Sequence, residues 1–340
     1  MKQLLPQRAQ YYKTNLHTHS TVSDGTLTPK EVKDLYKGLG YQVLCITDHQ
    51  VIVDHSNLND PDFLMLTGVE VNHNNKNYRP RYDGQVYHLN LIAKRPDLLW
   101  APGSVRHKYP GAAPYEDAID YAGMCMGYDV DAVNAMIAAA NEKGFLVFYN
   151  HPDWSCQSYP DYAPLRGLWG VEVRNTECVQ QTGLDTNNTR VFKELLNVGN
   201  RRLCPLGTDD MHYRPAAGGA WIMVGAEALS YESVIRALEQ GDLYMSCGPE
   251  IYSLTVDGTA LRITCSEATR ICVGNHGRFG RTAVAQGGEL LTEAEFDLSA
   301  FLGKAEGDPN AYIYVTVTDA KGQYAMTRPY YLEDLQEEER

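Results

Sequence analysis

The chain has 340 residues, of which 44% are hydrophobic and 21% charged, and its formal net charge is −13. A chain of this length can bury a large core, as two domains or as one barrel with an appendage. The acidic balance argues against broad contact with nucleic acid or anionic lipid, because such contact depends on clustered Lys and Arg. A small anionic ligand is still compatible with this charge if metal ions supply positive charge locally.

The eight cysteines form no close-spaced pairs of the C-x-x-C kind. This spacing gives no sign of a disulfide framework or a thiolate metal site, so we expect reduced thiols and a cytoplasmic location. The first fifteen residues lack the apolar stretch of a signal peptide, and no run approaches the length of a membrane span. We therefore expect no membrane partner.

Short apolar runs rich in Val, Ile, Leu, Tyr and Phe predict strands in the first three quarters of the chain. In chain order these are Tyr12–Leu16, Val43–Thr47, Leu64–Val71, Gln85–Ala93, Phe145–Tyr149, Gly170–Val173 and Leu203–Gly207. Helices are predicted between several of them, at residues 28–38, 129–143, 187–198 and 231–240, from capping residues and terminal glycines. This alternation predicts an α/β fold with a mostly parallel sheet, either open or closed into a barrel.

After Cys247 the pattern changes to short alternating runs separated by Gly, Asp and Asn, without a helix of core length. Such a pattern is typical of a small all-β unit, and a sandwich is the arrangement we expect. The predicted division is therefore 1–247 for an α/β barrel and 248–340 for an all-β appendage. The segment 95–126, rich in Pro, Gly, Ala and Tyr, predicts a long surface insertion near the barrel mouth.

Polar residues of metal-ligand type recur where the predicted strands end. They are His17, His19, His49, Glu70, His88, His151, Asp209 and His212, with Asp24 in a nearby Ser-Asp-Gly turn. Because the carboxyl ends of parallel strands meet at one face of an α/β fold, these side chains are expected to lie together. Each alone has an ordinary explanation, such as a hydrogen-bonded histidine or a helix cap, and only their co-occurrence points to a shared site.

Nitrogen and oxygen ligands without thiolates suit Zn, Mn or Fe, and their number exceeds what one tetrahedral ion needs. Two or three ions that share a bridging carboxylate would account for the surplus. The motifs H-T-H, S-D-G, T-D-H, G-V-E, N-H-P and T-D-D-M-H, together with His88, resemble the PHP (polymerase and histidinol phosphatase) superfamily. The resemblance covers roughly residues 16–247.

The resemblance implies a distorted (β/α)7 barrel with a di- or trinuclear metal site. It implies that His17, His19, Glu70 and Asp209 hold one ion, and that Glu70 bridges to a second ion held by His88 and His151. A third ion would be held by Asp24, His49 and His212. The segment Gly241–Pro249, followed by strands, is similar to stand-alone PHP proteins grouped with carbamate-ester hydrolases of the CehA/McbA type.

The leading hypothesis from the sequence is a metal-dependent phosphoesterase that hydrolyses a phosphate ester on a small, anionic molecule with a metal-bridging hydroxide. Asp210 or His212 would relay a proton to the leaving group, and Arg174 would contact the phosphate. Tyrosines in 78–82 and 109–115 are candidates for lining the pocket. Two alternatives stay open: a carbamate, ester or amide hydrolase with the same metal site, and a metal-stabilised binding module without catalysis. A nucleic-acid partner is not expected, and a homo-oligomer is left open.

Overall fold

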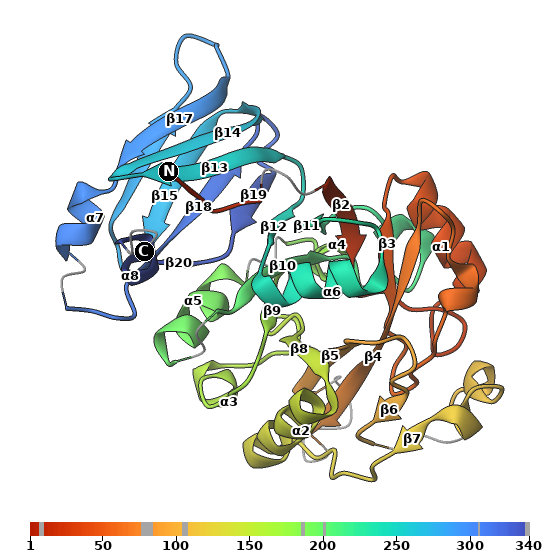
Figure 1. The fold of residues 1–340 in the computed structure, drawn as a ribbon. Coiled ribbons are helices and arrows are strands. Elements are labelled where there is room, and N and C mark those ends of the chain that lie inside the picture. Colours follow the sequence, from red (N-terminus) through yellow and green to blue (C-terminus); the bar gives the residue numbers. More distant parts are fainter. Residues whose placement is uncertain are drawn as a thin grey trace.

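The computed structural model describes residues 1–6, 10–75, 84–103, 108–184, 188–199, 202–304 and 307–336. It is a mixed α/β structure with a large sheet and with helices on its outer faces (Figure 1). The blue C-terminal strands lie to one side of the larger part, and the N-terminus lies beside them. Within the described residues no helix is long and apolar enough to cross a lipid bilayer.

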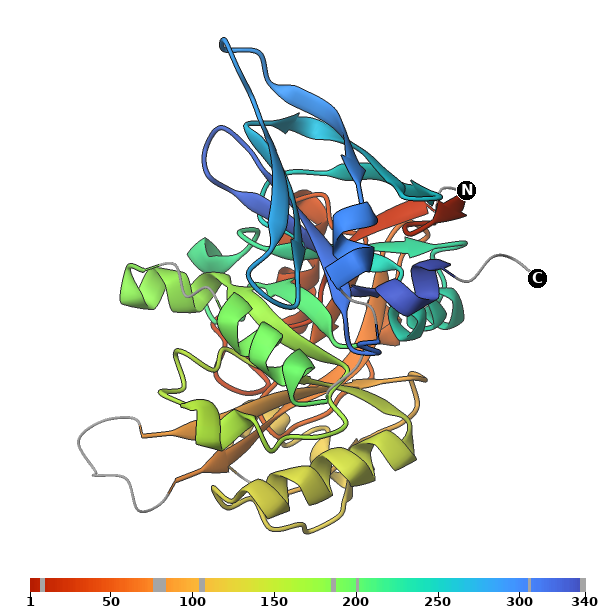
Figure 2. The same cartoon turned by 90° about the vertical axis from the view of Figure 1, so that its left-hand side faces the viewer.

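The larger part holds most of the helices. Its strands are β2 (Gln10–Asn15), β3 (Val43–Ile46), β4 (Leu64–Asn74), β5 (Val86–Ala93), β8 (Phe145–Tyr149), β9 (Gly170–Asn175), β10 (Cys204–Thr208), β11 (Trp221–Ala226) and β12 (Leu243–Ser246), with β6 (Trp100–Ala101) pairing β7 (Asp120–Tyr121). Its helices are α1 (Pro29–Gly38), α2 (Val130–Lys143), α3 (Tyr159–Tyr162), α4 (Thr176–Thr182), α5 (Thr189–Asn197) and α6 (Tyr231–Gln240). Figure 2 shows α2 and α5 on the outside of this part.

The helix ends agree with the capping residues of the sequence. Thr28 caps α1 in a capping box with Glu31, and Asp129 caps α2 through the backbone N–H of Ala132. Helix α2 ends at Gly144, which has φ 102°, a left-handed conformation that glycine adopts without steric cost. The predicted helices at 28–38, 129–143 and 231–240 are confirmed. The fourth begins at Thr189, and part of its predicted start lies outside the described residues.

The expectation of a mostly parallel sheet is only partly correct. Strands β2, β3 and β4 pair in parallel, as do β8, β9 and β10, but β5 runs antiparallel to both β4 and β8. Eleven residues separate β4 from β5, too few for the crossover that parallel neighbours need. Strand β11 also runs antiparallel to β2, so the sheet continues past the predicted strands.

Seven neighbouring strands of the large sheet form a series in the order β10-β9-β8-β5-β4-β3-β2. Hydrogen bonds join the two ends of this seven-strand series. The chain that leaves β10 meets the chain that leaves β2: Asp210 N–H donates to the His17 carbonyl at 2.9 Å, and His19 N–H donates to the Met211 carbonyl at 2.9 Å. The bridge between Thr18 and Met211 is parallel. These bonds bring the carboxyl ends of β2 and β10 together at one edge.

The C-terminal part contains β1 (Lys2–Gln3), β13 (Ile251–Asp257), β14 (Ala260–Ala268), β15 (Arg270–Asn275), β16 (Gly280–Val284), β17 (Leu291–Asp297), β18 (Tyr312–Thr318), β19 (Tyr324–Thr327) and β20 (Tyr330–Tyr331), with short helices α7 (Ser299–Lys304) and α8 (Leu332–Gln336). Strands β1, β13, β14 and β17 form one sheet, whereas β15, β16, β18 and β19 extend the large sheet through the pairing of β19 with β12. The large sheet therefore crosses the predicted boundary at residue 247.

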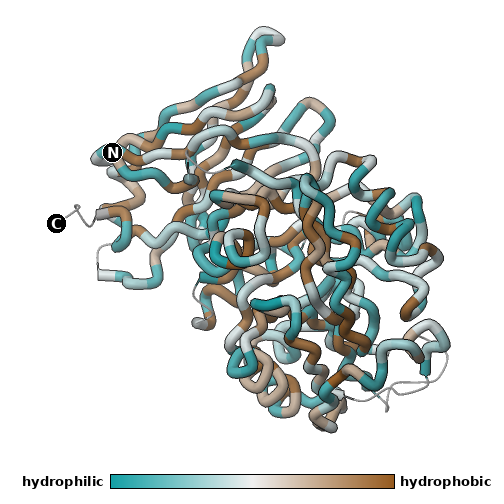
Figure 3. The backbone as a smooth tube through the Cα atoms, turned by 45° about the vertical axis from the view of Figure 1, so that its right-hand side comes forward, coloured by the Kyte–Doolittle hydropathy of each residue, from teal (hydrophilic) through white to brown (hydrophobic). Residues whose placement is uncertain are grey.

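Two large apolar cores result from this arrangement, and a third, smaller one lies between α1, β3 and β4. One lies around the strands of the larger part, where hydrophobic segments gather in the interior (Figure 3). The other lies between the two layers of the C-terminal part and includes Leu254, Ile263, Ile271 and Val315. Leu5 belongs to this second core, so the beginning of the chain packs with residues near its end.

This packing predicts that Leu5→Ala lowers the free energy of unfolding by about 2–5 kcal/mol, because Leu5 is only 1% exposed and its loss leaves a cavity. Urea denaturation measures the change. Leu184→Ala is the matched control, since Leu184 is 71% exposed and its replacement should change stability by less than about 0.5 kcal/mol. Equal effects of the two substitutions would contradict the packing described.

Candidate metal centre

Three groups of histidine and carboxylate side chains lie at the edge where the chain leaves β2, β3, β8 and β10. Within each group the possible ligand atoms all lie within 4.8 Å of one another. The groups are His17, His19, Glu70 and Asp210; Glu70, His88 and His151; and His19, Asp24, His49 and His212. Glu70 belongs to the first and second groups and His19 to the first and third, so the three groups are contiguous.

The central group has the spacing of a coordination shell. The Nε2 atoms of His17 and His19 each lie 3.0 Å from Asp210 Oδ1, 3.3 Å from a Glu70 oxygen and 3.3 Å from each other. Ligands held about 2.0–2.1 Å from one ion lie roughly 2.8–3.4 Å apart, the range of edge lengths of an octahedron and a tetrahedron. The central group therefore fits a transition metal ion.

The other two groups extend this arrangement to either side of Glu70. In the second group, Glu70 Oε1 lies 3.0 Å from His88 Nδ1 and 3.6 Å from His151 Nε2. In the third group, Asp24 lies 3.6 Å from the Nε2 atoms of both His49 and His212. The Asp24 side chain is 42% exposed, whereas that of Glu70 is 1% exposed, so the third group is the one open to solvent.

Several of these atoms lack hydrogen-bond partners although they are buried. Among the described residues, His19 Nδ1 makes no hydrogen bond, and His49 Nδ1 and Glu70 Oε2 lie 3.0 Å apart without the geometry of one. A buried polar atom without a partner costs free energy that a bound cation would offset, because each atom can offer a lone pair. The donor set, its spacing and its unsatisfied atoms all fit divalent metal ions.

Electrostatics couple the members of the cluster. Burial works to raise the pKa of Glu70, but His88, His49 and His17 outweigh it and hold this pKa well below its usual range. Burial works to lower the pKa of His212, but Glu177, Asp210 and Asp24 raise it to about 10. Glu70 is therefore a carboxylate, the form in which it can bridge two ions.

Two orienting carboxylates were not identified from the sequence. Glu172 on β9 lies 2.5 Å from His17 Nδ1, and it also accepts hydrogen bonds from Thr208 Oγ1 and the His151 N–H. A carboxylate on one imidazole nitrogen fixes the tautomer and leaves the other nitrogen free to bind a metal. The available signal was a charged residue within the predicted strand Gly170–Val173, which is otherwise apolar.

Glu177 has the same role at the other side of the cluster. Its Oε2 accepts the His212 N–H at 2.8 Å, and its Oε1 lies 3.3 Å from His212 Nδ1. Glu177 lies on α4, a seven-residue helix that the sequence did not predict. Each end of the cluster is thus oriented by a buried glutamate that is not itself in any ligand group.

One predicted ligand is corrected by the structure: Asp210, and not Asp209, joins the central group. The Asp209 carboxylate instead accepts hydrogen bonds from Gly218 N–H at 2.7 Å, Thr176 Oγ1 at 2.7 Å and Tyr36 OH at 3.0 Å. These bonds hold the Asp209 side chain away from the cluster, whereas Asp210 Oδ1 lies 3.0 Å from the Nε2 atoms of both His17 and His19. The other predicted ligands all lie in the three groups.

Strained backbone is concentrated at the cluster. Five non-glycine residues of the described chain have positive φ, and three of them lie here: Gln50 at 61°, His151 at 24° and Asp210 at 54°. Such conformations cost about 1–3 kcal/mol each and persist only where surrounding contacts impose them. The strain at Asp210 turns its carboxylate toward both His17 and His19.

Three further candidates from the sequence lie outside the ligand groups. Arg174 lies half-buried on β9, and its contact with a phosphate stays a prediction. Burial and the carboxylates of Asp24, Glu70 and Asp48 raise the pKa of Tyr109, which agrees with a place for segment 109–115 beside the cluster. Residues 78–82 lie outside the described part of the chain, and their role stays a prediction.

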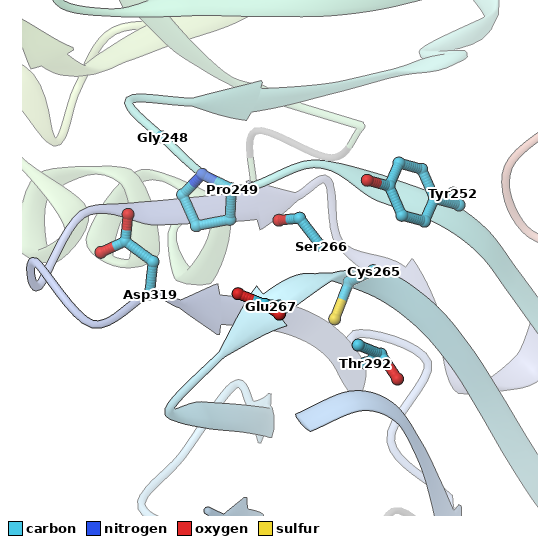
Figure 4. A pocket seen from close by; sticks show the side chains of 8 residues that line it. All are labelled: Gly248, Pro249, Tyr252, Cys265, Ser266, Glu267, Thr292 and Asp319. Atoms are coloured by element: carbon cyan, nitrogen blue, oxygen red, sulfur yellow. The ribbon is translucent and has the colours of Figure 1, made fainter. Parts of the chain in front are cut away.

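A separate hollow, of about 430 Å³, lies in the C-terminal part (Figure 4). Its lining includes Tyr252, Ser266, Glu267, Thr292 and Asp319, which come from β13, β14, β17 and the turn after β18. No histidine lines this hollow. The histidine cluster is therefore the better candidate for a metal centre.

No protein-family model matches the chain. Among curated proteins, it is 31% identical over 127 residues to a 5'-3' exoribonuclease of Haemophilus influenzae. This match covers 34% of the chain and 43% of the relative, so the chain spans less than half of the curated protein that it matches.

The chain is also similar to several solved structures. One is a two-domain protein of Bacteroides vulgatus that contains a predicted PHP-like metal-dependent phosphoesterase, with 15% identity and a TM-score of 0.43 over 97% of this chain and 98% of that one. Another is an amidohydrolase from Chromobacterium violaceum, with 16% identity and a TM-score of 0.36 over 58% and 87%. A third is a lesion-specific endonuclease from Pyrococcus furiosus, with 11% identity and a TM-score of 0.38 over 68% and 56%. Because these TM-scores are low, the geometry of the cluster itself is the basis for a functional assignment.

The position of Asp209 leads to a prediction. Asp209→Asn should lower the free energy of unfolding by about 1–3 kcal/mol, because an amide NH₂ would replace an oxygen that accepts bonds from buried donors. Thermal and urea denaturation measure the change. The control Asp97→Asn removes only a surface pair with Arg95 and should leave stability unchanged. Unchanged stability of Asp209→Asn would show that Asp209 does not organise this turn.

Proposed function

We propose that this protein is a metal-dependent phosphoesterase of the PHP superfamily that hydrolyses a phosphate ester on a small molecule. The observation that carries the proposal is the convergence of six histidines and three carboxylates into three contiguous groups with coordination spacing. The motif resemblance supports the same family. The seven strands from β2 to β10, joined end to end by the bonds between Asp210, His17, His19 and Met211, support a distorted (β/α)7 barrel with an all-β appendage.

The ligand assignment follows the three groups. His17, His19, Glu70 and Asp210 would hold one ion, and Glu70, His88 and His151 a second. His19, Asp24, His49 and His212 would hold a third, at the exposed side of the cluster. Zn, Mn and Fe all suit such nitrogen and oxygen donors.

Bound divalent ions would supply Lewis acidity and the positive charge that stabilises a phosphoryl group as negative charge builds on it. The protein's own residues fix the geometry. Glu172 keeps Nδ1 of His17 as the donor to its carboxylate, and Ser155 Oγ lies 3.1 Å from His151 Nδ1, so each Nε2 is directed at the cluster. Because Asp210 Oδ1 contacts both His17 and His19, we assign Asp210 to the ligands.

With the third position empty, His212 is the better candidate for proton transfer to the leaving oxygen, because an Nε2 atom that binds an ion carries no proton to donate. Its side chain is 26% exposed, against 9% for His49 and 0% for His19 in the same group. It is also oriented by Glu177 from the side away from Asp24. A general acid must reach the substrate as well as hold its proton, and this exposure allows that reach.

A second candidate function is hydrolysis of a phosphodiester at an RNA end. The curated relative is named a 5'-3' exoribonuclease, and this is the observation that favours it. The net charge of −13 favours a small substrate instead, because an RNA-binding track needs clustered Lys and Arg. We also propose a cytoplasmic location, since the eight cysteines show no disulfide framework.

The shared position of Glu70 predicts the effect of its loss. Wild-type protein treated with a chelator and reloaded with Mn or Zn should bind two or three ions per chain, measured by inductively coupled plasma mass spectrometry. Glu70→Gln should lose at least one ion and reduce phosphatase activity by more than about 100-fold. This loss exceeds the effect of replacing a residue that only hydrogen-bonds a metal ligand. Glu267→Gln, a change of the same kind in the C-terminal hollow, should leave both unchanged. A full metal complement in Glu70→Gln would contradict the assignment.

A substrate panel separates the candidate reactions. Metal-loaded protein should hydrolyse phosphate monoesters at least tenfold faster than aryl carbamates, carboxylic esters or single-stranded RNA, measured as kcat/KM. Faster turnover of the carbonyl compounds would favour the carbamate, ester or amide hydrolase, and faster turnover of RNA would favour the exonuclease. A protein that binds its metals tightly but hydrolyses nothing would be a binding module.

A further inference from the structure

Trp154 lies at the border of the second group and has no part in the reaction proposed above. It lies in the loop that follows β8 and begins at Asn150. The centroid of its ring lies 4.9 Å from that of His151, at an interplanar angle of 75°, and 6.1 Å from that of His88. The indole is only half-buried. A large aromatic ring therefore stands beside two predicted ligands with part of its surface open to solvent.

A hydrogen bond from the indole orients this ring. Its Nε1–H donates to Gln181 Oε1 at 2.8 Å, and Gln181 Nε2 donates to Glu177 Oε1 at 2.9 Å. Glu177 is the carboxylate that orients His212. Trp154 is thus connected through Gln181 and Glu177 to the opposite side of the cluster. A ring held in this way loses little conformational freedom when a ligand binds.

The chemistry of the open surface defines what it binds. The only polar atom of the indole is already paired with Gln181, so the exposed remainder offers its apolar ring surface. Such a surface binds planar aromatic groups by stacking.

We propose that Trp154 is a specificity-determining residue that stacks on a planar aromatic ring of the substrate. The inference rests on the proposed phosphoesterase function and adds a substrate class to it: phosphate esters whose organic group carries such a ring. The ring belongs to an aryl group or to a nucleobase. With the phosphoryl group at the cluster, this organic group lies over the second group of ligands.

The test compares two phosphonates that share a head group and cannot be hydrolysed. Isothermal titration of metal-loaded protein should give a phenylphosphonate affinity roughly 5- to 150-fold higher than that for methylphosphonate, the range of one stacking contact. Trp154→Ala should reduce this ratio to about one, and Trp154→Phe should keep most of it. Tyr252→Ala, which removes an exposed ring in the C-terminal hollow, should leave the ratio unchanged. Metal content is measured for each variant.

A kinetic experiment distinguishes this inference from the proposed function. KM is compared for phenyl phosphate, a nucleoside monophosphate and glycerol phosphate. Trp154→Ala should raise KM for the two ring-bearing esters alone. The ester whose KM rises more shows whether the substrate's ring is an aryl group or a nucleobase. Equal affinity for the two phosphonates, no binding of either, or an equal loss for all esters in Trp154→Ala would overturn the stacking role. A ring preference in titration without turnover of any ester would overturn the proposed function and leave the inference standing.

Discussion

The site depends on one buried carboxylate, that of Glu70, and on the charges that compensate it. Its side chain is 1% exposed, yet Oε1 lies 3.0 Å from His88 Nδ1 and Oε2 lies 3.0 Å from His49 Nδ1, with His17 and His19 each at 3.3 Å. An isolated carboxylate in such a place would be very unfavourable. Protonated imidazoles or bound cations must accompany it, so the histidines and Glu70 form a single electrostatic unit. Replacing any one of them changes the electrostatic environment of the others.

The fold positions that unit through the ends of its strands. Six strands of the seven-strand series run in one direction, and the chain that follows β2, β3, β8 and β10 carries histidines and aspartates of the three groups to a common edge. The bonds between Asp210 and His17 and between His19 and Met211 hold β10 against β2, which is what brings residue 210 to residues 17 and 19. The strain at Asp210 and His151 is the local cost of this convergence.

The sequence predicted most of this site because ligand residues at strand ends leave a linear signal. The sequence did not predict those features that depend on which strands pair, because strand pairing leaves no such signal. Asp209 and Asp210 are adjacent and chemically identical, and only the bonds that join β10 to β2 decide which one faces inward. Glu177 lies on a short helix that begins immediately after β9, without the length that makes helical periodicity visible. The pairing of β11 with β2, and of β12 with β19, joins segments distant in sequence.

On the proposed function, the same unit would allow an acidic protein to bind an anion. With neutral imidazoles, the three carboxylates of the cluster give it a charge of −3, which would repel a phosphate. Two divalent ions would change this to +1 and three to +3, so the third group, which includes Asp24, would set how strongly the centre attracts an anion. The third group is also the most exposed, and its occupancy would therefore couple anion binding to the metal available in solution. Selectivity among phosphate esters would then come from the organic part of the substrate, because the phosphoryl group is common to all of them.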